Sequence, residues 1–218
     1  MLKIAFNNNY IHPLEENHRF PMIKYELIPE QLIRENTCSD KNFFKPEMID
    51  EKIVLKTHQL QYFNRLKKQK LSSKEIREIG FPLSKELYIR EMTISKGTID
   101  CVNFSIDNGI SMNIAGGTHH AFYDRGEAFC MLNDQAIAAN YILDNGLAKK
   151  ILIIDLDVHQ GNGTASIFKN NNSVFTLSFH GKNNYPFRKE KSDLDIELED
   201  NTNDEIYLNL LMETIPEI

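Results

Sequence analysis

Residues 151–159 read ILIIDLDVH, four aliphatic residues followed by three polar residues spaced two apart. An unbroken aliphatic run of this length is typical of a strand buried on both faces of a parallel sheet. Because side chains alternate along a strand, Asp155, Asp157 and His159 are expected to project to one side. They follow the strand at its carboxyl end, where open α/β sheets bind ligands. The stretch therefore predicts a parallel α/β fold and a candidate metal site.

Short apolar runs and helical patterns alternate along the rest of the chain. Ser72 and Glu75 match a capping box, and Gly80 is expected to end the helix that it opens. This alternation indicates βαβ units, so we predict one parallel-sheet domain flanked by helices over residues 1–218. The helix expected at 202–212 leads to no further strand, which predicts a sheet that is incomplete at its C-terminal end. The predicted strands are 2–6, 111–115, 151–155, 173–179 and 195–198, and the predicted helices are 57–70, 72–80, 91–109, 135–144, 165–168 and 202–212.

Composition restricts the classes of function. The net charge of −6 argues against nucleic-acid binding, and the basic run at 65–70 is interpreted as a solvated helix end. No apolar run approaches the ~20 residues of a membrane span, so no membrane partner is expected. Three distant cysteines without a CxxC pair, Cys38, Cys101 and Cys130, indicate a reducing compartment. A cytoplasmic protein is therefore predicted.

The strand-end triplet supplies two natural metal ligands. Catalytic zinc usually takes three protein ligands from His, Asp, Glu or Cys, plus water. Asp157 and His159 are the predicted ligands, and Asp155, deeper in the sheet, is better placed to orient another group. The alternative interpretation is a strand-end aspartate that caps the next helix beside an ordinary hydrogen-bonded histidine.

A second polar group is the sequence GGTHH at 116–120. The glycines allow close approach of a ligand to the backbone, and the histidines are candidate ligands, acid–base groups or polar surface. A histidine acting as a general base needs a hydrogen bond that positions its second nitrogen. Asp155 and Asn162 are the available partners, although the glycines around Asn162 are also explained by a simple turn. Phe129 and Tyr185 fit either a core or a pocket wall.

Together these residues resemble the histone deacetylase family, within the arginase/deacetylase superfamily. The likeness begins at His12 and Pro13, continues through HRFPM at 18–22, and is densest from Gly116 to Tyr185. The joint pattern GGTHHAF, DRGEAFCMLND, DLDVHQGNG and TLSFH is specific. The HQGNG variant resembles the class IV-like and bacterial branch.

The resemblance implies an arginase/deacetylase-like fold and hydrolysis of an acetylated lysine side chain, or of an acetylated small amine, by metal-activated water. It implies that Asp157 and His159 bind Zn²⁺. His120 would be the general base, with His119 as its electrostatic partner and Asp155 orienting it. Asn162 falls where many relatives carry an Asp that orients the base.

The resemblance also implies two accessory sites. Phe129, Tyr185 and Gly117 match a substrate channel that holds the acyl-lysine stem. A structural K⁺ or Na⁺ is implied beneath the zinc, mostly on backbone carbonyls. Its residues would be Asp155, Asp157, His159, Ser178 and Phe179.

Two features of the family pattern are missing from this sequence. No later aspartate matches the third zinc ligand, and no glycine follows Gly181 to form the turn before the tyrosine that polarises the carbonyl. We therefore expect the N-terminal portion of a truncated deacetylase domain, inactive alone. The alternative is a non-catalytic binding module that self-associates through an open sheet edge. A binuclear ureohydrolase is disfavoured, because Gly161 stands where its additional carboxylate is needed.

Overall fold

Strands and helices alternate along the chain, as the sequence pattern predicts. The computed structural model describes residues 1–218. In chain order the elements are β1 (Lys3–Ala5), η1 (Asn8–Tyr10), α1 (Lys24–Arg34), η2 (Asp40–Asn42), β2 (Phe43–Phe44), α2 (Glu51–Val54), α3 (Leu60–Lys67), α4 (Ser73–Ile79), α5 (Lys85–Asn108), β3 (Ser111–Asn113), α6 (Asp134–Asp144), β4 (Ile151–Asp155), α7 (Asn162–Phe168), β5 (Val174–Gly181), β6 (Leu194–Leu198), α8 (Asp204–Thr214) and η3 (Ile215–Glu217).

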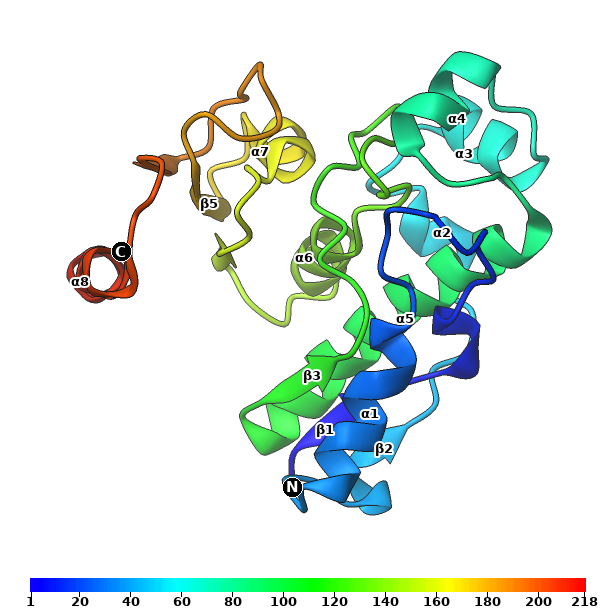
Figure 1. The fold of residues 1–218 in the computed structure, drawn as a ribbon, viewed down its shortest axis with the longest axis horizontal. Coiled ribbons are helices and arrows are strands. Elements are labelled where there is room, and N and C mark those ends of the chain that lie inside the picture. The colour runs from blue at the N-terminus through cyan, green and yellow to red at the C-terminus, as the bar shows by residue number, and fades with distance from the viewer.

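The strands form two parallel sheets. β1 lies between β2 and β3 in one sheet, and β5 lies between β4 and β6 in the other. All four strand pairings are parallel, which confirms the predicted α/β fold. β3 and β4 form no backbone hydrogen bonds with each other, so the strands make two separate sheets. Figure 1 shows α6 between the elements around α5 and the group that contains β5 and α7, and α6 packs against both α5 and α7.

The main core lies around α5 in the N-terminal part of the chain. This helix begins at Lys85, earlier than predicted, because the Ser84 side chain accepts a hydrogen bond from the Leu87 N–H at 3.0 Å. It continues through Gly97 to Asn108 and packs beside β1 and β3. The first sheet is thereby anchored to the core that supports one side of the functional site.

The second sheet has a much smaller core. Ile153 of β4 packs with Phe168 and Val174 against α6. On the opposite face, Leu152 and Ile154 are 41% and 36% exposed, and no residue of α8 is buried. This sheet therefore presents an uncovered apolar face beside the free edge of β4.

Several local predictions are corrected by tertiary contacts. The helix predicted from 57 begins at Leu60, because the buried His58 side chain bonds to backbone groups of Phe122 and Asn133. The helix predicted from 202 begins at Asp204, because the Asn203 side chain caps α8. Helix α1, which contains Pro29, was not predicted. None of the helices combines the length and the apolarity needed to cross a membrane.

Candidate active site

A cavity of about 560 Å³ lies where the chain leaves β3 and β4. Loops that follow strands of both sheets line it, so its lining combines segments that are far apart in sequence. The lining residues are Arg19, Phe20, Pro21, Lys24, Tyr25, Glu78, Arg90, Gly116, Gly117, Thr118, His119, His120, Ala128, Phe129, Cys130, Asp157, His159 and Tyr185. The predicted histidine pair, metal ligands and channel residues therefore meet in one place.

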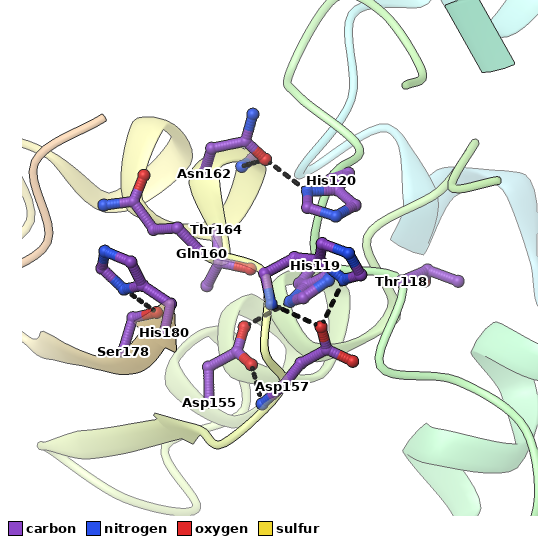
Figure 2. Close-up of polar contacts among 12 residues, drawn as sticks. Thr118, His119, His120, Asp155, Asp157, Gln160, Asn162, Thr164, Ser178 and His180 are labelled. Carbon is purple, nitrogen blue, oxygen red and sulfur yellow. Dashed lines mark hydrogen bonds and ion pairs between the residues drawn. The ribbon is translucent and has the colours of Figure 1, made fainter. Parts of the chain in front are cut away.

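The two adjacent histidines bond to different partners (Figure 2). His119 Nδ1 lies 2.5 Å from Asp155 Oδ2, and His120 Nδ1 lies 2.6 Å from Asn162 Oδ1. An amide oxygen can only accept, so His120 carries its proton on Nδ1. Its Nε2 is then free to accept a proton, as a general base requires.

The same partners give the two imidazoles opposite basicity. Burial, followed by the charge of His119, lowers the pKa of His120 to about 4. Burial also disfavours the charged form of His119. The hydrogen bond and the negative charge of Asp155 outweigh burial, however, and raise the pKa of His119 above its ordinary value. At neutral pH this arrangement favours a neutral His120 beside a more basic His119.

Asp157 and His159 lie together after β4, at the cavity wall. Asp157 Oδ1 is 2.7 Å from His159 Nδ1 and accepts the His159 backbone N–H at 2.8 Å. Their side chains are 50% and 39% exposed. Burial raises the pKa of Asp157, but the hydrogen bonds from His159 and the charge of His119 leave it below its ordinary value. No group of three or more His, Cys, Asp or Glu side chains is arranged to hold a metal. The chain thus contributes two candidate ligands.

The Phe129 wall of the cavity is held by strained backbone. Ala128 and Phe129 both adopt positive φ angles, +43° and +66°. Their N–H groups donate to the last carbonyls of α4, those of Glu78 at 2.9 Å and Ile79 at 2.6 Å. These bonds satisfy helix-end acceptors that would otherwise lack partners. The end of α4 therefore fixes the position of Phe129.

This strain predicts that Ala128→Gly raises the free energy of unfolding by about 0.5–1 kcal/mol, because glycine adopts positive φ without a steric penalty. Urea denaturation measures the change. The matched control is Ala138→Gly in α6, which removes a buried methyl group from a helix and is expected to destabilise by about 1 kcal/mol or more. A loss of stability in the Ala128 variant would contradict the prediction.

Tyr185 forms another part of the wall. Its ring meets the His120 ring edge-to-face, with centroids 5.0 Å apart, and lies 6.2 Å from the His159 ring. Its hydroxyl donates to Glu127 Oε2 at 3.1 Å. The aromatic face is thus next to both the histidine pair and the candidate metal ligands.

Comparison with known proteins agrees with this arrangement. The family model described as the histone deacetylase domain matches residues 14–218. An uncharacterized protein of Picosynechococcus is 39% identical over 208 residues, which cover 95% of this chain and 69% of that protein. The chain belongs to the histone deacetylase family. The resemblance predicted from the motifs is confirmed.

More distant deacetylase-family relatives agree. Histone deacetylase 2 of Arabidopsis thaliana is 26% identical over 212 residues. The structure of an HDAC homolog from Aquifex aeolicus matches with a TM-score of 0.83 at 23% identity, and a homolog complexed with SAHA matches with 0.82. Those two matches establish the fold. The chain spans 65% of both structures and 54% of the Arabidopsis protein.

The residues predicted for a monovalent cation lie on β4, on β5 and in the turn after β4. Asp155 and Ser178 are paired in register on β4 and β5, and both are buried. Ser178 Oγ is 3.0 Å from His180 Nδ1, and Phe179 packs against Tyr207 of α8. The cation site itself stays a prediction.

Sequence reasoning missed the cations at the other side of the cavity. Arg90 is almost fully buried, donates to the Tyr10 carbonyl and pairs with Glu91. Lys24 and Arg19 also line the cavity. A charged pair in the apolar stripe of a long helix was the available signal for Arg90. Arg19 belongs to the HRFPM motif but was given no role, and Lys24 begins α1, which was not predicted.

Proposed function

We propose that residues 1–218 are the N-terminal portion of a zinc-dependent deacetylase domain of the class IV-like, bacterial type. The domain hydrolyses the acetyl amide of lysine or of a related small amine with metal-activated water. The observation that carries this proposal is the hydrogen-bonded pair His119 and His120 facing Asp157 and His159 in one cavity. Family membership is consistent with it.

The donors present fit part of a zinc site. Asp157 and His159 are of the types that zinc binds, they converge, and hydrogen bonding favours the charged carboxylate. They supply two of the three protein ligands usual in catalytic sites. A zinc ion bound there supplies Lewis-acid polarisation of an amide carbonyl and lowers the pKa of a bound water. A structural K⁺ or Na⁺ beneath it is also proposed. Its residues would be Asp155, Asp157, His159, Ser178 and Phe179.

The chain's own residues have distinct proposed roles. His120 Nε2 takes a proton from water and later returns it to the leaving amine, while Asn162 holds its Nδ1 proton. His119, kept basic by Asp155, stabilises negative charge developing nearby. Phe129, Tyr185 and Gly117 line the cavity and hold the slim alkyl stem of the substrate. A ligand with this stem is consistent with the SAHA complex of a similar structure.

The proposal includes location and partners. The three cysteines form no disulfide, which is consistent with a reducing cytoplasm. The acidic net charge gives no support for direct nucleic-acid binding. We propose further that the 218-residue chain is inactive alone, because a third ligand and a carbonyl-polarising tyrosine have no counterpart in it.

The second candidate function is a binding module that self-associates. The free edge of β4 and the exposed side chains of Leu152, Ile154 and Phe175 favour it. Light scattering over a range of concentrations is expected to show association, which Leu152→Lys should reduce. Monodisperse monomers at high concentration would contradict this candidate.

Zinc titration tests the metal centre. Tag-free protein is expected to bind one zinc ion, weakly, because two ligands form an incomplete set. Asp157→Ala or His159→Ala should reduce the affinity by at least about tenfold. Asp107→Ala, at an exposed position of α5, is the control and should bind as the unaltered chain does. Zinc binding that neither cavity variant changes would refute the site.

A ligand titration tests the substrate class separately. Acetyl-lysine amide is expected to shift the NMR signals of the His120 and Tyr185 rings, whereas lysine amide should not. No shift with the acetylated compound would refute the proposed substrate. Hydrolysis of an acetyl-lysine substrate that is lost in His120→Ala would support the deacetylase and overturn the claim of inactivity.

A further inference from the structure

The Tyr185 wall lies on a segment that is hydrogen-bonded to Gln160, Thr176 and Glu199, all of which follow the start of β4. Residues 182–193 connect β5 to β6 without a helix or strand, and Arg188 and Lys191 within them are exposed. The segment makes one side-chain hydrogen bond to the chain before β4, from Tyr185 to Glu127. The position of the ring beside His120 therefore depends on Glu127.

Glu127 is itself held by three further hydrogen bonds. Its backbone exchanges hydrogen bonds with Cys130 in both directions, at 3.0 and 2.8 Å. Its Oε1 accepts from Arg125 Nε at 2.8 Å, and the Arg125 guanidinium stacks 3.6 Å from the centre of the Phe122 ring. Its side chain is only 21% exposed. The Oε2 that receives the Tyr185 hydroxyl is thus fixed before any ligand enters.

We infer that Glu127 is the positioning residue of the channel, which holds Tyr185 against the catalytic pair by accepting a hydrogen bond from its hydroxyl. A fixed Tyr185 keeps the passage to His120 narrow and admits an unbranched stem. This inference rests on the proposed function only where it calls the cavity a substrate channel. Burial and the nearby Glu127 carboxylate both raise the pKa of Tyr185, which keeps its hydroxyl protonated as the donor.

Limited proteolysis tests whether the Tyr185–Glu127 hydrogen bond holds residues 182–193 in place. Glu127→Ala is expected to increase trypsin cleavage at Arg188 about tenfold, because loss of a hydrogen bond to a charged acceptor frees the segment. Tyr185→Phe removes only the hydroxyl and should give the same increase. The double variant should add nothing further, since both changes break one bond. Glu127→Gln keeps an acceptor and should restore most of the protection.

A spectroscopic measurement separates positioning from general stability. In Glu127→Ala the NMR signals of the His120 ring should move towards their positions in Tyr185→Leu, because the Tyr185 ring no longer shields them. Glu213→Ala, an exposed glutamate of α8 without a side-chain partner, should leave both cleavage and His120 signals unchanged.

Wild-type cleavage at Arg188 and unchanged His120 signals in Glu127→Ala would overturn the inference. If that variant unfolds, Tyr185→Phe alone decides, because it removes a single hydroxyl at a half-buried ring. None of these measurements requires zinc or hydrolysis. Failure of zinc binding would therefore count against the proposed function, and failure of the restraint would count against Glu127 only.

Discussion

Gly163→Ala is expected to lower the free energy of unfolding by about 3 kcal/mol or more, which is the largest effect that we predict for one methyl group. A Cβ at this position would overlap the Ala121 carbonyl oxygen and lie 2.7 Å from that of His119. Both neighbours are backbone atoms, so no side chain can move aside. Helix α7 must then shift away from the loop that carries the histidine pair.

The shift is expected to affect the site as well as stability. The Thr164 N–H donates to the His119 carbonyl at 3.2 Å, and Asn162 on the same helix holds His120. NMR signals of both histidine rings should therefore change in Gly163→Ala.

Urea denaturation with Gly146→Ala as the control separates the close contact from backbone strain. Gly146 has a φ of +64°, and a methyl group added there would meet no other atom within 4 Å. Alanine at this position should therefore cost only about 1 kcal/mol, from the positive φ alone. Equal losses in the two variants would contradict the prediction.

Acidification from pH 7 to pH 4 is expected to remove about 3 kcal/mol of stability through His58 alone. Burial lowers the pKa of His58 to about 4, against opposing hydrogen bonds to Phe122 and Tyr123. In the unfolded chain its pKa is about 6.5. Between these values the unfolded chain binds the extra proton, so this stability is present above about pH 6.5 and is lost as the pH falls towards 4.

The structural cause is the position of the ring. His58 Nδ1 donates to the Phe122 carbonyl at 2.9 Å, and Nε2 accepts the Asn133 N–H at 2.9 Å, so a second proton on the ring breaks the latter bond. The unfolding free energy of His58→Gln, measured at several pH values, should fall less steeply between pH 6.5 and 4 than that of the unaltered chain. Equal slopes would refute the assignment.

Parts of the fold and the site that depend on local sequence were predictable. Residues 151–155 form β4, and the capping box at Ser72 and Glu75 opens α4. Asn133 caps α6 as expected. The contact of His119 with Asp155 was implied by the family resemblance, since the residues alone left Asp155 and Asn162 as alternative partners for the histidine pair.

Other parts depend on contacts that no local pattern encodes. The Tyr185–Glu127 bond joins residues 58 apart in the chain, and neither lies in a helix or strand. The division of the strands into two sheets depends on which edges pair, and alternation of apolar residues does not specify neighbours. Helix α1 was missed because Pro29 disfavours a helix, although the fold accommodates it.

The hydrogen bonds between α4 and Phe129 let changes in α4 affect the position of Phe129 at the cavity wall. Fraying of a seven-residue helix releases its last carbonyls first, and here those carbonyls hold Ala128 and Phe129. The opposite end of α4 is secured by Ser72 and by Glu75, which also pairs with Arg65. Substitutions at this solvent-facing end would therefore change how firmly Phe129 is held, while Phe129 itself and the histidine pair stayed the same.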